Sequence, residues 1–205
     1  MKLFYLPGAC SLADHIVLEW IGLPYEAVAV PRDQLKGKEF LAINPAGSVP
    51  ALRLDDGSVL TQNVVILDYL SSIAPQAGLS GDGTPLSRAD VLRWTTFLNA
   101  DVHPSFSHLF AAARFVDGEE AQANLKQKAK SRLRGDFERL DAQIGDGVWL
   151  VGNRRSIADT YLYVVTRWAH AMQVDLSGLD NLARHFEYMS ADPGVKAALG
   201  SEGLN

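Results

Sequence analysis

The spacing of hydrophobic residues changes once along this chain, and that change limits the folds open to it. Before residue 75, short runs of strand-forming residues alternate with helical spacing, whereas the periodic segments after residue 86 are all helical. Residues 75–85 contain three glycines and two prolines and little apolar content, which is typical of a linker. We therefore predict one domain over residues 1–74, a linker over 75–86 and an all-helical domain over 87–205.

The first domain is predicted to be a small sheet covered by helices. Strands are expected at 2–5, 25–30, 51–54 and 58–60, and helical segments at 11–22, 38–43 and 61–73. The Asp56-Gly57 pair predicts a hairpin between the last two strands, and a right-handed crossover joins the first two. This order predicts a thioredoxin-like domain. The fold class is therefore α+β, with a thioredoxin-like domain followed by an all-α helical bundle.

Two long helices are predicted in the second domain. Apolar residues at steps of three and four make one stripe, formed by Leu125, Ala129, Leu133, Phe137, Leu140 and Ile144. The lysines and arginines between 126 and 134 occupy the opposite face, where we expect solvent rather than a bound anion. A later helix begins after Ser156, with Asp159 placed to complete its cap. That helix is apolar on most sides, so we expect it to be central and buried.

Composition excludes several classes of protein. A net charge of −5 disfavours nucleic acid as a partner, and no apolar stretch approaches the roughly 20 residues that span a bilayer. The first five residues form a strand-like segment without the layout of a signal peptide. The only cysteine, Cys10, permits neither an internal disulfide nor a multi-cysteine metal site. We therefore expect a cytoplasmic protein without metal.

Cys10 is the first candidate for chemistry. It follows a strand and a Pro7-Gly8 turn, where free N–H groups at the start of a helix favour a thiolate and lower the thiol pKa. The alternative is a small buried residue that only fills space. A dithiol oxidoreductase is disfavoured because position 13 is alanine rather than a second cysteine. Ser11 either donates a hydrogen bond to a bound sulfur or caps the helix.

Five further residues have both a structural and a functional interpretation. Val49-Pro50 either begins a strand or offers the Val49 backbone to an extended peptide. Gln62 and Asn63 open a helix, where they either cap it or hold a carboxylate or an ammonium of a ligand. His103 lies on the first helix after the linker, and a lone histidine on a helix is more often structural than catalytic.

Four sets of residues carry a further signal: 1–12 with His15-Ile16, 40–52, 55–57 with 66–70, and 149–163. Taken in this order, they resemble the glutathione transferases, most closely the bacterial beta class, over nearly the whole chain. The resemblance implies a glutathione site on the thioredoxin-like domain, with the cysteinyl backbone of glutathione paired to Val49 beside a cis Val49-Pro50 bond. It also implies the γ-glutamyl end at Gln62 and Asn63.

The same resemblance implies the remaining site residues. The glutathione sulfur would lie near Cys10, which beta-class proteins can join to glutathione as a mixed disulfide, and near His103. Lys36 would stand near the glycyl end, and the helical domain would wall an electrophile pocket with Phe110 and Trp168. A homodimer is implied, in which the partner's first long helix reaches the site around Thr96 and Asn99.

This chain departs from the class pattern at three places. Gln62 and Asn63 replace a usual Glu followed by Ser or Gly, Pro104 follows the histidine where a basic residue is usual, and Thr96 replaces an Asn. A proline inside a helix removes a hydrogen bond and can kink it. These departures predict weaker glutathione binding than in typical members.

The resulting hypothesis is an enzyme that conjugates the glutathione thiolate to small apolar electrophiles. Cys10 would add glutathione-dependent thiol exchange or peroxidase activity, and Cys10, Ser11 and His103 would be the catalytic residues. The alternative is a non-catalytic protein that binds glutathione or hydrophobic ligands on the same fold. An isomerase or dehalogenase using glutathione is disfavoured because the start of the chain lacks the double-serine-cysteine motif of isomerase members.

Overall fold

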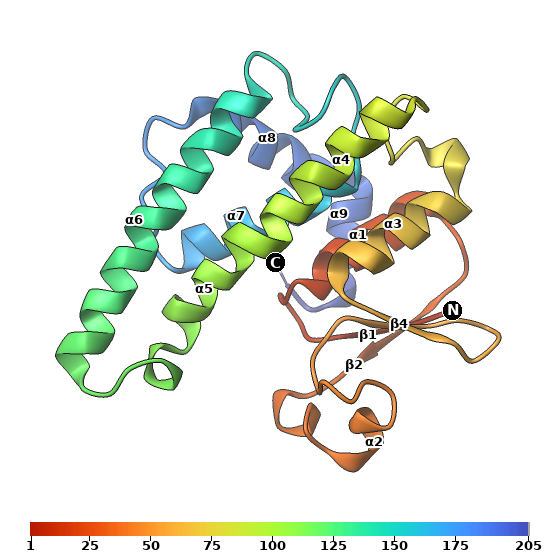
Figure 1. Cartoon of the computed structure of the whole chain (residues 1–205). Helices are drawn as coiled ribbons and strands as arrows, with labels where there is room; N and C mark the ends of the chain where they lie inside the picture. The colour runs from red at the N-terminus through yellow and green to blue at the C-terminus, as the bar shows by residue number, and fades with distance from the viewer. Residues whose placement is uncertain (205) are drawn as a thin grey trace.

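The computed structural model describes residues 1–204 and shows a sheet domain followed by a helical domain (Figure 1). The elements of the first domain are β1 (Lys2–Tyr5), α1 (Ser11–Ile21), β2 (Glu26–Ala29), the 3₁₀ turn η1 (Arg32–Gln34), α2 (Lys38–Leu41), β3 (Ala51–Arg53), β4 (Val59–Thr61) and α3 (Asn63–Ile73). The strands lie in the order β2-β1-β3-β4, with β1 parallel to β2 and antiparallel to β3. The predicted fold class is confirmed.

Helices α1 and α3 cover one face of the sheet, and α2 lies on the other side (Figure 1). The boundary between β4 and α3 differs slightly from the prediction. Thr61 pairs with Ala51 across the hairpin, so the strand extends one residue further and the helix begins at Asn63. Helix α1 packs against α3 and also against α7 and α9 of the helical domain, which places its N-terminus between the two domains.

The second domain contains only helical elements and turns between them, within the part of the chain that the structure describes. They are the 3₁₀ turn η2 (Pro75–Ala77), α4 (Pro85–Phe97), the π-helical segment η3 (Leu98–Val102), α5 (His103–Phe110), the 3₁₀ turn η4 (Ala112–Arg114), α6 (Glu119–Ile144), α7 (Ile157–Ala171), α8 (Asp180–Ala191) and α9 (Pro193–Ser201). The predicted linker thus holds η2 and the start of α4. The domain boundaries themselves stay predictions.

Helices α4 and α5 form one bent rod, and α6 runs beside it (Figure 1). The bend lies at η3, where the His103 N–H bonds back to the Leu98 carbonyl across a wide turn. Pro104 follows directly and has no N–H to donate, so the rod cannot continue with regular α-helical bonding there. The kink that Pro104 can cause takes the form of a π-helical turn, which carries Asn99 and leads into His103.

Helix α7 is buried along most of its length, as its all-round apolar sequence predicts. Ser156 and Asp159 form a reciprocal capping box at its start. Asp159 also accepts a hydrogen bond from the Leu150 N–H at 2.8 Å and lies 3.1 Å from His185 Nε2. One continuous buried core runs from the sheet through α1 and α7 to α9, so the two domains share it. No helix within residues 1–204 has the length and apolarity needed to cross a membrane.

Candidate active site

A cavity of about 310 Å³ opens between the N-terminus of α1, the loop before β3, the start of α3 and the bend in the helical rod. Its walls are formed by Cys10, Asn44, Ala46, Ser48, Val49, Pro50, Thr61, Gln62, Asn63, Asn99 and His103. The structure therefore brings together most of the residues that the sequence singles out. They come from segments up to 93 residues apart, between Cys10 and His103.

Cys10 is the N-cap residue of α1, and its side chain is only 8% exposed. Its Sγ lies 3.7 Å from the Val49 carbonyl oxygen, to which the thiol donates. Burial, reinforced by the nearby Asp14 carboxylate, raises the pKa of the Cys10 thiol to about 12. The backbone N–H groups of Cys10 and Ser11 lower this pKa, as the sequence suggests, but they are outweighed. The expected thiolate is therefore wrong: at neutral pH Cys10 is a thiol.

Ser11 is completely buried and is absent from the cavity wall. Its Oγ accepts a hydrogen bond from the Leu6 N–H at 3.3 Å and lies 3.5 Å from the Leu6 carbonyl oxygen. The hydroxyl thus ties the turn before α1 to the helix start. Its contact with a bound sulfur stays a prediction.

The loop before β3 provides backbone groups to the cavity. The Val49-Pro50 peptide is cis, as the resemblance implies. Sequence reasoning missed Asn44, whose amide nitrogen donates to the Ser48 carbonyl at 2.6 Å while its oxygen accepts from the Ala46 N–H at 3.1 Å. An Asn that bonds its own backbone two residues on is typical of a turn, and this is the signal that could have found it. Asn44 thereby fixes the loop that presents Val49.

Lys36 reaches the edge of this loop. Its Nζ donates to the carbonyl oxygen of Ala46 at 2.7 Å, and Ala46 lines the cavity. The lysine side chain is exposed, so its charge lies at the rim rather than inside. Its role at the glycyl end of a ligand stays a prediction.

Gln62 and Asn63 differ sharply in environment. Gln62 has φ 73° and ψ 120°, a backbone conformation that non-glycine residues rarely adopt, and strain of this kind is concentrated at ligand sites. Asn63 is 3% exposed. With its amide oriented so that the nitrogen faces acceptors, the nitrogen lies 2.6 Å from Asp14 Oδ2 and 3.2 Å from the Cys10 carbonyl oxygen. The Asn63 side chain therefore joins α3 to α1 beneath the cavity.

Asp14 explains why an asparagine follows Gln62. The Asp14 carboxyl is fully buried, which raises its pKa well above the usual range, and the negative charge of Glu202 adds to this shift. A buried carboxyl needs hydrogen-bond donors, and the Asn63 amide provides one. Sequence reasoning passed over Asp14 because an acidic residue in the first turn of a helix is ordinary.

His103 projects into the cavity from the start of α5 and belongs to a hydrogen-bonded chain. Its Nδ1 lies 2.7 Å from the hydroxyl oxygen of Tyr161, and that hydroxyl donates to Asn99 Oδ1 at 3.1 Å. Burial lowers the pKa of His103, so the imidazole is neutral at neutral pH. Tyr161 lies on the central helix α7, where the sequence marks it only as an apolar core position.

The remaining predicted residues lie outside the cavity wall. The Trp168 ring centroid is 4.8 Å from that of His103 and 5.5 Å from that of Phe110, so the three rings make a continuous aromatic surface. Phe110 is 52% exposed. Thr96 is exposed on α4, one turn before Asn99, whereas Asn99 lines the cavity of its own chain. Asn99 therefore reaches this cavity without a second protomer. The contribution of Thr96 from a partner stays a prediction.

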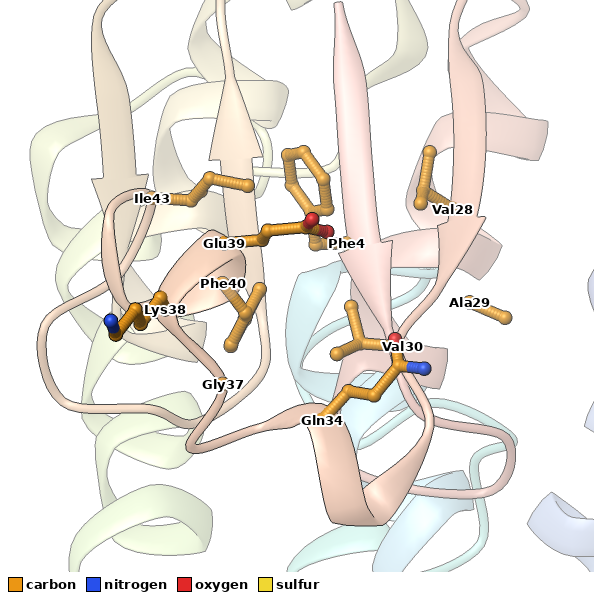
Figure 2. A pocket seen from close by; sticks show the side chains of 10 residues that line it. All are labelled: Phe4, Val28, Ala29, Val30, Gln34, Gly37, Lys38, Glu39, Phe40 and Ile43. Atoms are coloured by element: carbon orange, nitrogen blue, oxygen red, sulfur yellow. The ribbon is translucent and has the colours of Figure 1, made fainter.

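Another cavity, of about 500 Å³, lies between the sheet and α2, on the side of the sheet away from α1 and α3 (Figure 2). Figure 2 shows that side chains from β1, β2 and α2 surround it, including Phe4, Val28 and Phe40. None of the predicted site residues is among its lining residues. Within residues 1–204, no group of three or more His, Cys, Asp or Glu side chains is arranged to hold a metal ion.

The fold and the cavity together define a class of protein: a thioredoxin-like domain with a thiol at a helix N-terminus, completed by a helical domain that brings a histidine to the same cavity. Two family models match the chain, the glutathione S-transferase N-terminal domain over residues 9–73 and the glutathione S-transferase C-terminal domain over 94–193. The chain belongs to the glutathione S-transferase family.

Individual relatives agree with this assignment. A glutathione S-transferase from Xanthomonas campestris pv. campestris is 47% identical over the full length of both chains. A bacterial beta-class glutathione S-transferase from Sphingomonas chungbukensis has a TM-score of 0.89 and 37% identity, with both chains fully covered. A sphingomonad glutathione S-transferase complexed with glutathione has a TM-score of 0.88 and 37% identity, also with full coverage of both chains. The predicted enzyme class and the beta-class resemblance are confirmed.

Proposed function

We propose that this enzyme binds glutathione in the 310 Å³ cavity and conjugates its sulfur to small apolar electrophiles. The observation that carries the proposal is the convergence on one cavity of the Val49 backbone, the strained Gln62 at a helix start, and the neutral His103. The sphingomonad relative complexed with glutathione supports the choice of ligand. Detoxification in the cytoplasm is the cellular role that we propose.

Each part of the tripeptide is assigned a partner in the cavity or at its rim. The cysteinyl backbone of glutathione pairs with the Val49 N–H and C=O like an added strand. The γ-glutamyl carboxylate lies at the N-terminus of α3, where Gln62 and Asn63 offer N–H groups and the helix dipole favours a negative charge. The glycyl carboxylate lies toward Lys36 at the rim. This arrangement places the glutathione sulfur near Cys10 and His103.

In the proposed mechanism, a ring nitrogen of neutral His103 accepts the proton of the glutathione thiol, and the resulting thiolate attacks the electrophile. A new carbon–sulfur bond forms, the bond to the leaving group breaks with its electron pair, and the imidazolium later returns its proton to solvent. The aromatic surface of Phe110 and Trp168 beside His103 suits an apolar electrophile. Cys10 contributes as a neutral thiol that can donate a hydrogen bond.

Thiol exchange through Cys10 is proposed as a second, slower activity. The Cys10 sulfur attacks a glutathione mixed disulfide and releases one thiol, and a second glutathione thiolate then displaces the bound glutathione as a disulfide. Exchange requires the Cys10 thiolate, which a pKa of about 12 makes scarce at neutral pH. Conjugation is therefore the main activity in this proposal, and any peroxidase activity is limited in the same way.

A homodimer is part of the proposal. Val65 on α3 is 49% exposed and Leu86 on α4 is 75% exposed, on two helices that contact each other. Large apolar side chains exposed on neighbouring elements favour association with a partner. A second copy on this surface would bring its own α4, with Thr96, near the site.

The test of the glutathione site is Gln62→Ala. We expect the KM for glutathione to rise about tenfold with kcat changed by less than about twofold, because the side chain binds ground state and transition state equally. Gln173→Ala is the matched control, since Gln173 is exposed, also has a positive φ of 54°, and lies at the end of α7. A fall in kcat alone, or the same change in both variants, contradicts the proposed site. Glutathione binding without turnover of any electrophile would instead support the non-catalytic alternative.

A further inference from the structure

We propose that Tyr161, with Asn99, is a positioning residue that fixes the tautomer of His103, so that Nδ1 carries the proton and Nε2 presents a lone pair to the cavity. Only the expected effect on kcat rests on the proposed function. The tautomer itself follows from three side chains on three elements, α7, η3 and α5.

The direction of the hydrogen bonds follows from the single proton of a tyrosine hydroxyl. Asn99 Oδ1, which lies 3.1 Å from the Tyr161 hydroxyl, is an acceptor only, so the hydroxyl proton points toward Asn99. The 2.7 Å contact between the Tyr161 oxygen and His103 Nδ1 must then use a proton on Nδ1. A neutral imidazole has one N–H, which leaves Nε2 unprotonated.

The surroundings leave Nε2 available to a ligand. Within residues 1–204, the His103 side chain makes one hydrogen bond, the one through Nδ1, and it lines the cavity beside Cys10 and Val49. The Trp168 ring packs at 66° to the imidazole with a centroid distance of 4.8 Å, which restricts ring rotation. Tyr161 itself is completely buried, so its hydroxyl cannot exchange its hydrogen bonds to Asn99 and His103 for bonds to solvent. The ring is therefore held in one orientation and one protonation pattern.

Tyr161→Phe tests the assignment because it removes the hydroxyl and keeps the ring. In wild-type protein labelled with ¹⁵N at its histidines, two-bond ¹H–¹⁵N correlation spectra should show His103 protonated at Nδ1, and His103→Gln identifies the signal among the five histidines. In Tyr161→Phe we expect the proton on Nε2, because Nδ1 then faces a buried hydrocarbon ring. A wild-type signal protonated at Nε2, or an unchanged tautomer in the variant, overturns the proposal.

Asn99 provides a second pair of variants. Asn99→Asp keeps an acceptor and should keep the Nδ1–H tautomer, whereas Asn99→Ala frees the Tyr161 hydroxyl to donate to His103 and should move the proton to Nε2. Identical tautomers in these two variants contradict the role of Asn99. These spectra require no substrate. They assign the tautomer even in a variant of lower stability, as long as the histidine signals of the folded protein are resolved.

Kinetics give an independent measurement. We expect Tyr161→Phe to lower kcat for conjugation about tenfold while the KM for glutathione changes by less than about twofold, since a general base contributes 100-fold or more and a mispositioned one retains part of this. Tyr163→Phe is the matched control, because Tyr163 is equally buried on the same helix and its hydroxyl contacts Ser190 at 3.4 Å, outside the cavity. An equal loss in both variants contradicts a positioning role. If the wild-type enzyme turns over no electrophile, the proposed function fails while the spectra still decide the tautomer.

Discussion

At the scale of single residues, the environment of a side chain decided its chemistry more than its position in the sequence. Cys10 sits at a helix start, which favours a thiolate, yet burial and the neighbouring Asp14 raise its pKa to about 12. Asn63 opens a helix, where a cap is the common role, yet its amide faces the buried Asp14. The burial of Cys10 and the contact between Asn63 and Asp14 depend on packing between segments that are distant in sequence, so no local pattern could predict them.

The lone thiol allows the Cys10 pKa to be measured directly. A shift from 9.0 to about 12 lowers the thiolate fraction at neutral pH about 1000-fold, because each pKa unit is a factor of ten. We expect iodoacetamide to alkylate native Cys10 at least that much more slowly than the same protein unfolded in urea. The native rate should rise about tenfold per pH unit through the alkaline range in which the protein stays folded.

The alkylation rate of Cys10 rises with pH because a raised pKa moves deprotonation of the thiol to higher pH. Unfolded protein supplies the reference because the thiol and its neighbours in sequence are unchanged. A native rate that matches the unfolded rate, or one that levels off below about pH 9, would show that the pKa of native Cys10 is not raised.

At the scale of helices and strands, most of the architecture was predictable from local signals. Periodicity identified α1, α3, α6 and α7, and Asp56-Gly57 identified the hairpin. The π-helical turn at Leu98–Val102 was not predicted, although the reason for it, Pro104, was recognised. Its form depends on how the bent rod packs on α6 and α7, which involves contacts distant in sequence. The turn matters for the site because it carries Asn99.

The cap of α7 is a prediction at this scale. Asp159→Ala should lower the free energy of unfolding by about 3 kcal/mol, since it removes acceptors for the buried Ser156 and Leu150 N–H groups and leaves His185 without its partner. Urea denaturation measures the change. Asp180→Ala, at the exposed first turn of α8, is the matched control and should cost at most about 1 kcal/mol. Equal costs at the two helices would contradict the buried network.

At the scale of the whole molecule, the turn before Cys10 is held by residues of the helical domain, one of them close to the end of the described chain. Glu202 follows α9, and its carboxylate accepts from the Gly8 N–H at 2.9 Å and lies 3.0 Å from His15 Nδ1. Trp168 Nε1 donates to the Gly8 carbonyl at 2.8 Å. Both polar groups of Gly8, two residues before Cys10, are therefore held by the helical domain. Sequence reasoning divided the chain at the linker and could not see this dependence.

Glu202→Ala tests that dependence. It leaves the Gly8 N–H and the buried His15 without their acceptor, at a cost of about 1–3 kcal/mol for each group, so we expect the thermal midpoint to fall by several degrees. Glu187→Ala is the control, an exposed glutamate on α8. Thermal unfolding followed by circular dichroism gives the measurement. A midpoint equal to that of the control would mean that the C-terminal contact does not support the fold.

The hydrogen bond from the Gly8 N–H to Glu202 has a consequence for biosynthesis. Gly8 and Cys10 are translated within about the first two seconds, whereas the carboxylate that holds Gly8 is added almost two hundred codons later. A nascent chain carrying the complete first domain still lacks a partner for Gly8. Competence to bind a ligand should therefore arise on the ribosome only after residue 202 has emerged.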